Sequence, residues 1–343
     1  MSFTYKKKVI SPAELRQAYP LSDEDIKVKA DRDEEIKRIL RGDSDKFLVI
    51  IGPCSADNED SVLDYTHRLA RVQEEVKDKL LIIPRVYTNK PRTTGEGYKG
   101  LLHQPDPEQQ PSISEGLKAM RRLHVRVLKE TGLSAADEML YPENSSYLMD
   151  LLSYVAVGAR SVEDQQHRLV ISGMDCAAGM KNPTSGDFTV MLNSITAAQA
   201  EHNFLYRTYE VQTSGNPYAH AILRGAVNKH GQSIPNYHYE DLTLLYNMYQ
   251  ERELKNPAVI IDANHANSNK DYSQQPRIVS EIMYNRSINS DLNKFVRGVM
   301  IESYIEAGSQ STHDHVYGKS ITDPCLGWEE SEKLIHAIAD KVK

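Results

Sequence analysis

Phe47-Leu48-Val49-Ile50-Ile51 is a short apolar run that leads, three positions later, to Cys54. Seven later runs of the same kind also lead to a residue able to do chemistry. These runs cover 80–84, 133–136, 155–157, 177–180, 221–223, 258–261 and 299–301, and they lead in turn to Arg85, Glu138, Arg160, Lys181, Arg224, His265 and Glu302. A parallel barrel holds all its strand ends on one face, where barrel enzymes keep their active sites. The eight runs therefore predict an α/β fold, a (β/α)8 TIM barrel with one site at its mouth.

Helical stretches separate these runs after residue 46, as expected for parallel strands that need crossover connections. The expected helices cover 60–78, 113–131, 144–153, 161–169, 188–200, 239–254, 270–287 and 328–342. The segment 203–218 breaks the alternation, and we expect 204–207 and 209–211 to form a β-hairpin inserted before barrel strand 6. We expect an N-terminal extension over residues 1–46, followed by the catalytic barrel over residues 47–343.

The N-terminal extension is expected to be helical. Ser11-Pro12 is typical of an N-cap followed by a first-turn proline, and Ser22 with Asp25 resembles a capping box. Apolar residues recur between positions 23 and 41, and Gly42 is placed to end that helix. Two roles stay open for this segment: a covering helix, or an arm for subunit contact or regulation.

Composition and charge argue against several classes of protein. At 343 residues the chain can bury a large core. With 26% charged residues and a net charge of −7, it has no polybasic surface for nucleic acid. No apolar stretch approaches the roughly 20 residues of a membrane span, and residues 1–30 lack the order of a signal peptide. Three cysteines are too few for a disulfide framework. We therefore expect a cytoplasmic protein with neither a nucleic-acid nor a membrane partner.

Four residues at or beyond strand ends are able to ligate a metal: Cys54, His265, Glu302 and Asp323. Each has a structural alternative, as a buried small residue, a hydrogen-bonded histidine or a salt-bridge partner. Together they offer one sulfur, one nitrogen and two carboxylate donors, a set softer than an all-oxygen magnesium site. This set predicts one divalent metal per subunit, Mn, Fe, Co or Zn.

Positive residues also gather at or just after the strand ends: Arg85, Lys90, Arg92, Arg160, Lys181 and Arg224. Such a group would repel itself unless anions lie between its members. Arginine binds phosphate and carboxylate through a bidentate fork, and lysine binds them as a point charge. The group predicts small substrates with several negative charges, although solvated surface charge is the ordinary role of any single member.

The string Lys90-Pro91-Arg92-Thr93-Thr94 is the most specific short pattern in the chain. Proline stiffens the loop between the lysine and the arginine. Arg92 and the Thr93 hydroxyl would grip a phosphate together, while Lys90 faces the reacting centre.

Several motifs, in order, now identify a resemblance. They include Gly52-Pro53-Cys54-Ser55, Lys90-Pro91-Arg92-Thr93-Thr94, Gly179-Met180-Lys181-Asn182, Asp262-Ala263-Asn264-His265-Ala266-Asn267-Ser268 and Tyr317-Gly318-Lys319-Ser320-Ile321-Thr322-Asp323. Over residues 12–340 the chain resembles the type I 3-deoxy-D-arabino-heptulosonate-7-phosphate (DAHP) synthases. The resemblance implies condensation of phosphoenolpyruvate with erythrose 4-phosphate and water, the first step of the shikimate pathway to aromatic amino acids, by a homodimer or homotetramer.

The resemblance also implies roles for individual residues. Cys54, His265, Glu302 and Asp323 match the metal ligands. Arg85, Lys90, Arg160, Lys181 and Arg224 match the phosphoenolpyruvate site, and Pro91, Arg92 and Thr93 match the erythrose 4-phosphate loop. Lys90, His265, Asp323 and Glu138 match catalytic positions. We expect Lys90 to protonate the nascent alkoxide, with neighbouring cations lowering its pKa toward neutrality.

Two competing functions stay open. The related octulosonate-8-phosphate synthases share the barrel, but they carry a Lys-Ala-Asn-Arg type of loop where this chain has Lys90-Pro91-Arg92-Thr93. A non-catalytic barrel that senses metal and anions is the other alternative. The arm before Pro12 is short and basic, and the inserted hairpin is shorter than the family pattern, so altered or absent feedback inhibition is expected.

Overall fold

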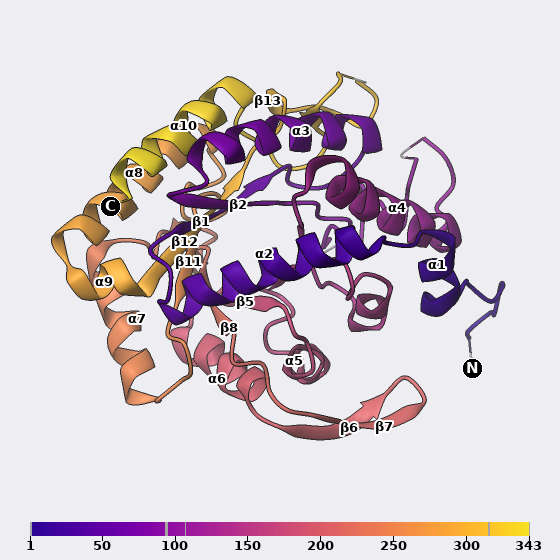
Figure 1. Ribbon diagram of the computed structural model, residues 1–343, viewed down its shortest axis with the longest axis horizontal. Helices are drawn as coiled ribbons and strands as arrows, with labels where there is room; N and C mark the ends of the chain where they lie inside the picture. The colour runs from indigo at the N-terminus through magenta and orange to yellow at the C-terminus, as the bar shows by residue number, and fades with distance from the viewer. Residues whose placement is uncertain (1, 93–94, 107, 315, 343) are drawn as a thin grey trace.

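A closed ring of parallel strands forms the centre of the computed structural model, which describes residues 2–92, 95–106, 108–314 and 316–342 (Figure 1). The strands are β1 (Phe47–Gly52), β2 (Leu80–Pro84), β3 (Ala136–Glu138), β4 (Tyr154–Val157), β5 (Ala177–Lys181), β8 (Ala219–Leu223), β11 (Val259–Asp262) and β12 (Val296–Glu302). Neighbours pair in the order β2-β1-β12-β11-β8-β5-β4-β3. The ring closes where the Val86 amide, just after β2, donates to the Ala136 carbonyl of β3 at 2.9 Å. The predicted (β/α)8 barrel is confirmed.

Helices pack around the outside of this ring. They are α3 (Glu59–Val76), α4 (Ile113–Thr131), α5 (Gln165–Ser172), α6 (Phe188–Gln199), α7 (Tyr239–Glu251), α8 (Gln275–Ile288), α9 (Ser290–Phe295) and α10 (Trp328–Lys341). The expected helix over 144–153 is wrong, because Pro142–Tyr147 forms a 3₁₀ helix (η1) in which Ser145 donates to the Pro142 carbonyl. Serine and asparagine compete for the backbone in this way and weaken helices. The helix expected from 161 begins at Gln165, where Asp164 caps it.

Two other boundaries differ from expectation. The strand expected over 133–136 becomes Ala136–Glu138, because Gly132 ends α4 in the left-handed region at φ 68° and the next residues lead the chain back to the sheet. The helix expected from 270 begins at Gln275, after a short 3₁₀ turn over Tyr272–Gln274 (η2), and the separate short helix α9 follows it.

Outside the barrel, the described residues form three two-stranded sheets. The hairpin β6 (His202–Tyr206) and β7 (Tyr209–Thr213) projects from the barrel below α5, which confirms the inserted hairpin (Figure 1). The other two sheets pair β9 (Ala226–Val227) with β10 (Ser233–Ile234), and β13 (Glu306–Ser309) with β14 (Lys319–Ser320). All of these elements lie between barrel strands or after the last one.

The N-terminal segment forms α1 (Pro12–Ala18) and α2 (Asp23–Arg41), and α2 seals the amino end of the barrel. Capping boxes at Ser11 and Ser22 start the two helices, and Gly42 ends α2 at φ 85°. Alternate strand residues face the helices or the barrel interior. Three side chains of α2 join the cluster that includes the interior-facing residues. They are Ile36, Ile39 and Leu40, and each is at most 2% exposed. Of the two roles left open for this segment, that of a covering helix describes α2. The boundary between an N-terminal extension and the barrel at residue 46 stays a prediction.

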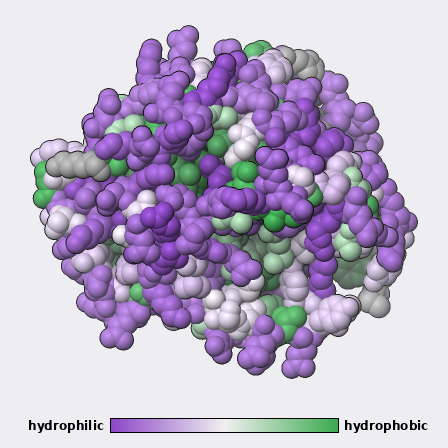
Figure 2. Space-filling model, in the orientation of Figure 1, coloured by the Kyte–Doolittle hydropathy of each residue, from purple (hydrophilic) through white to green (hydrophobic). Residues whose placement is uncertain are grey.

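The outer surface is mainly polar. In Figure 2 charged and polar side chains dominate the face seen in Figure 1, and apolar residues are visible in smaller areas between them. None of the described helices combines the length and the apolar character needed to cross a membrane.

The first prediction concerns the seal that α2 makes. Ile39→Ala is expected to lower the free energy of unfolding by about 2–5 kcal/mol, because it opens a cavity at the sealed end. The matched control is Ile26→Ala in the same helix, where the side chain is 53% exposed. It should change the free energy by less than about 0.5 kcal/mol. Urea denaturation of both variants makes the comparison, and equal losses would contradict the packing role of α2.

His220 on β8 is buried without a carboxylate close to it. Its Nδ1 lies 2.9 Å from the Tyr218 carbonyl, and its Nε2 lies 2.8 Å from the Tyr154 hydroxyl. Nδ1–H donates a hydrogen bond to this carbonyl and Nε2 accepts one from the tyrosine hydroxyl, which is the arrangement of a neutral ring. Burial lowers the pKa of His220 to about 4.

The second prediction follows from this neutral ring. In the unfolded chain the His220 ring binds a proton with a pKa near 6.5. The contribution of His220 to the free energy of unfolding is therefore fully present above about pH 6.5 and declines as the pH falls toward 4. The gap between the unfolded and folded pKa values of His220 corresponds to about 3 kcal/mol in the free energy of unfolding. His220→Gln should flatten this part of the stability profile, whereas His313→Gln, at an exposed position, should leave it unchanged. Chemical denaturation between pH 4 and 7 measures the slopes, and identical slopes in all three proteins would refute the assignment.

Candidate active site

A pocket opens at the carboxyl ends of the barrel strands, and most of the residues singled out from the sequence line it. The lining includes Cys54, Arg85, Lys90, Pro91, Glu138, Arg160, Lys181, Arg224, His265 and Glu302. Tyr87, Asn89, Ala159 and Thr184 complete it. Residues separated by up to 248 positions in the chain therefore meet in one cavity.

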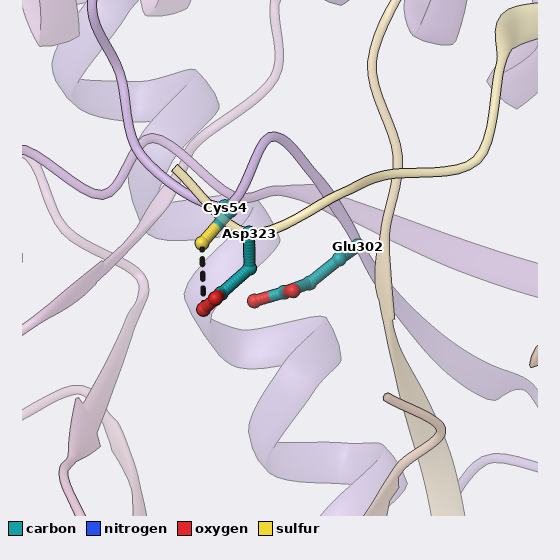
Figure 3. A group of neighbouring side chains, drawn as sticks. All are labelled: Cys54, Glu302 and Asp323. Carbon is teal, nitrogen blue, oxygen red and sulfur yellow. Dashed lines mark hydrogen bonds between the residues drawn. The ribbon is translucent and has the colours of Figure 1, made fainter. Parts of the chain in front are cut away.

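Three of the expected metal ligands form a compact cluster (Figure 3). The ligand atoms of Cys54, Glu302 and Asp323 all lie within 4.8 Å of one another. Cys54 Sγ lies 3.5 Å from Asp323 Oδ2, and Figure 3 draws this contact as a dashed line. His265 approaches from the side of Glu302, with Nε2 3.8 Å from Oε1. This mixture of sulfur, nitrogen and carboxylate oxygen fits a divalent transition metal better than magnesium.

Buried polar neighbours orient these ligands. Glu302 is 1% exposed and accepts from Arg85 Nη2 at 3.0 Å and from Asn264 Nδ2 at 2.6 Å. His265 has φ 48°, in the left-handed region that ordinary residues seldom adopt. Its Nδ1 lies 2.8 Å from Asp262 Oδ2, an ion-pair distance without hydrogen-bond geometry. Such backbone strain and outer contacts are common where ligands are held in place.

Lys90 lies against the cluster and bridges two of its members. Its Nζ donates to Cys54 Sγ at 2.7 Å and to Asp323 Oδ2 at 2.8 Å. Burial raises the pKa of the Cys54 thiol to about 11, with the charge of Glu302 adding to the effect and Lys90 opposing it. Burial favours a lower pKa for Lys90 itself, but the charges of Cys54 and Asp323 outweigh it and raise the pKa. The expected lowering by neighbouring cations is wrong, because Lys90 lies against the Asp323 carboxylate and the Cys54 sulfur and not against other cations.

A second ion-pair group lies deeper in the pocket. Lys181 Nζ lies 3.3 Å from Glu138 Oε2 and 3.9 Å from Asp262 Oδ2. Burial tends to raise the pKa of Glu138, but Lys181 and His265 hold it below its usual value. The guanidinium of Arg85 covers the Tyr87 ring at 4.1 Å from its centroid. Carboxylates of the chain itself therefore separate several of the cations that were expected to repel one another.

Some guanidinium N–H donors in the pocket lack hydrogen-bond partners among the described residues. Arg85 Nε and Nη1 and Arg224 Nη1 are buried and find no hydrogen-bond partner among the described residues. Burial lowers the pKa of Arg224, and the charge of Arg160 adds to this effect although Asp262 opposes it. Buried donors without partners are costly. An anion in the pocket would satisfy them.

The loop after β2 brings some of its predicted residues to the pocket. Thr88 begins the loop and is fixed by Asp137, which accepts from its amide at 2.9 Å and from its hydroxyl. Pro91 lines the pocket, whereas Arg92 does not: its Nε donates to the Tyr98 carbonyl at 2.8 Å. Thr93, predicted to bind phosphate with Arg92, lies outside the described residues.

The structure adds residues that the sequence reasoning did not assign. Asp262 and Asn264 contact His265 and Glu302, two of the expected metal ligands, and Tyr87 supports Arg85. Lys270, at φ 61°, lies 3.2 Å from Asp323 Oδ1. Asp262 and Asn264 stood inside a quoted motif and Tyr87 stands two positions after Arg85, so their position beside a named residue was the available signal.

Comparison with known proteins matches this architecture. A family model described as the DAHP synthetase I family matches residues 22–336. Phospho-2-dehydro-3-deoxyheptonate aldolase of Haemophilus influenzae is 38% identical, over 98% of this chain and 92% of the relative. The Phe-sensitive enzyme of the same name from Escherichia coli K12 is 37% identical, over 98% and 95%. The solved phospho-2-dehydro-3-deoxyheptonate aldolase from Francisella tularensis SCHU S4 superposes with a TM-score of 0.92 at 32% identity, over 99% of this chain and 98% of that chain.

These matches run from the N-terminal helices to the last helix, and they include the strands and loops that build the pocket. The predicted resemblance is therefore confirmed over nearly the whole chain. The chain belongs to the DAHP synthetase I family.

Proposed function

We propose that this chain condenses phosphoenolpyruvate with erythrose 4-phosphate and water to give 3-deoxy-D-arabino-heptulosonate 7-phosphate and phosphate, the first step of the shikimate pathway. Family membership supports the reaction, and relatives that carry the aldolase name cover nearly the full chain. The observation that carries the proposal is the set of buried guanidinium donors without partners, next to a cluster of metal-ligand atoms.

One divalent ion per subunit, Mn, Fe, Co or Zn, is the proposed cofactor. Cys54, His265, Glu302 and Asp323 would hold it. When bound, such an ion supplies Lewis acidity that polarises or orients the aldehyde carbonyl. Support comes from the donor chemistry and the close approach of the ligand atoms. The proposed assembly is a homodimer or homotetramer, supported by the family resemblance.

Phosphoenolpyruvate needs separate cations for its carboxylate and its phosphate. Arg160 and Arg224 are the residues proposed to bind the phosphate. Arg224 has an unsatisfied buried donor, and the positive charges of the two side chains repel each other. Arg85, Lys90 and Lys181 complete the proposed site, with Glu138 neutralising part of their charge. Arg85 offers two donors that Glu302 does not use.

Erythrose 4-phosphate is proposed to lie along the loop after β2, with Pro91 against the sugar and Arg92 and Thr93 on the phosphate. Pro91 lines the pocket, which supports placing the sugar against it. Arg92 would have to release the Tyr98 carbonyl or use its other nitrogens.

In the proposed reaction carbon 3 of phosphoenolpyruvate attacks the aldehyde carbon. Water adds at carbon 2, and phosphate leaves with cleavage of its bond to that carbon. Lys90 gives a proton to the aldehyde oxygen as it becomes a hydroxyl. The raised pKa of Lys90 keeps it protonated at neutral pH, which is the form that a donor requires, but it also makes Lys90 a weaker acid than one whose pKa lies near the working pH.

The third prediction tests the reaction through phosphate release from phosphoenolpyruvate. Release should require both erythrose 4-phosphate and a divalent transition metal, stop when a chelator removes the metal, and recover when the metal is restored. A colorimetric phosphate assay measures it. Arabinose 5-phosphate serving better than erythrose 4-phosphate would favour the octulosonate synthase activity. If metal-loaded protein releases no phosphate with either aldose, the alternative of a non-catalytic barrel that senses metal and anions would be favoured.

The fourth prediction concerns Lys90. Lys90→Met should lower kcat by about 10²–10⁴-fold, because the proton donor is lost, while the metal content measured by mass spectrometry persists. Lys99→Met is the matched control, since it removes a positive charge from the same loop at a residue that does not line the pocket. Near-normal turnover in Lys90→Met would refute the assigned role.

A further inference from the structure

A second cluster of positive charge lies at the opposite end of the barrel from the active site. We call it the basal cavity, a hollow of about 600 Å³ between β12, α8, α9 and the end of α10. Arg297 lies near the start of β12, whereas Glu302, in the active site, ends that strand. Five residues of extended strand span about 16 Å. The two cavities are therefore separate.

Cationic side chains dominate the lining of the basal cavity. Arg286, Lys294, Arg297 and Lys341 contribute to it, and the single acidic residue in its lining is Asp45. Figure 1 shows α8, α9 and the C-terminal end of the chain gathered at one side of the barrel. This cluster comes from elements that are distant in sequence and packed together in the fold.

Arg286 is buried and has no acidic partner among the residues that the structure describes. Its side chain is 8% exposed, and its guanidinium lies 4.4 Å from the centroid of the Phe47 ring. Nη2 donates to the Asn293 carbonyl at 3.3 Å, and Nη1 lies 3.7 Å from the sulfur of Met283. Nε has no hydrogen-bond partner within the part of the chain that the structure describes. The aromatic face and one carbonyl only partly replace the water that the charge has lost.

Arg297 is in a similar position. Its Nε is also buried and without a hydrogen-bond partner in the described ranges. Burial lowers the pKa of Arg297, with Asp45 opposing the shift. Burial lowers the pKa of Arg286 to about 10, and the charge of Arg297 adds to this effect. The negative end of α2 lies nearby, since a Cβ on Gly42 would come within 2.7 Å of Arg297 Nη2. Neither arginine forms an ion pair with a described carboxylate within 4.0 Å.

We propose that the basal cavity binds a small anion that carries a phosphate group. The buried guanidinium of Arg286 and the partly buried guanidinium of Arg297 repel each other, and an anion that accepts from both would stabilise them. Four cations against one acid favour a ligand with about two negative charges, which a phosphate group has at pH 7 and a single carboxylate does not. Arginine forks match phosphate oxygens in geometry as well as in charge.

The fifth prediction tests the site with inorganic phosphate, which also fits the active-site pocket. Calorimetry compares metal-free parent protein with two double variants. Arg160→Met/Arg224→Met removes the two arginines proposed to bind the phosphate of phosphoenolpyruvate, and it should bind one phosphate fewer than the parent while retaining the basal site. Arg286→Met/Arg297→Met should lose the basal site and bind one phosphate fewer than the parent. The control Lys77→Met/Lys118→Met removes two exposed positive charges outside both cavities and should bind as the parent does.

A stability measurement separates ligand binding from a purely structural role. Methionine keeps an apolar stem against Phe47 and removes the unpaired charge. The basal variant should therefore melt no lower than the parent in phosphate-free buffer. Phosphate should raise the melting temperature of Arg160→Met/Arg224→Met, and this increase should become smaller when the basal substitutions are added. If the combined variant does not fold, Lys294→Met alone should weaken basal phosphate binding by about 3–10-fold.

Unchanged phosphate stoichiometry in Arg286→Met/Arg297→Met would overturn the proposal, as would the absence of phosphate binding to folded Arg160→Met/Arg224→Met. Neither outcome bears on the proposed reaction, whose failure would appear in the turnover assay instead.

Discussion

Closure of the parallel strands into a ring is the constraint on which the site depends. Backbone hydrogen bonding between the segment after β2 and β3 completes the ring. Because all the strands run in one direction, each carboxyl end delivers its side chain to the same mouth. The Arg85–Glu302 pair then ties the ends of β2 and β12 across β1, with both side chains 1% exposed. Removing one partner would leave a buried charge unpaired.

The sequence allowed prediction of the strands and of the residues that would meet, because both follow from the order of apolar runs. It did not allow prediction of how charges would pair. Lys90 follows a strand end as Arg85 does, yet it faces Cys54 and Asp323 because the loop containing Asp323 folds over the mouth. Helix starts at Gln165 and Gln275 likewise depend on local capping and turns, which apolar periodicity does not encode.

The two ends of the barrel treat positive charge differently. At the carboxyl end, Glu302, Glu138 and Asp323 neutralise cations, while donors of Arg85 and Arg224 have no hydrogen-bond partner among the described residues. At the amino end, Arg286 and Arg297 have one nearby acid, Asp45, and an aromatic ring as their main electrostatic support. Sequence reasoning did not identify the second group, since neither arginine follows an apolar strand.

The seal made by α2 has a consequence for synthesis of the chain on the ribosome. Ile36, Ile39 and Leu40 emerge early, but the apolar cluster that they join also includes Ile260 and Met300. Translation at roughly 5–20 residues per second leaves this helix waiting for tens of seconds. During that interval its apolar face can meet β1 and β5, which α2 also contacts, but it still lacks the part of the cluster that β11 and β12 contribute. A nascent-chain chaperone that shields the first forty residues would therefore benefit this protein more than one acting on the finished polypeptide.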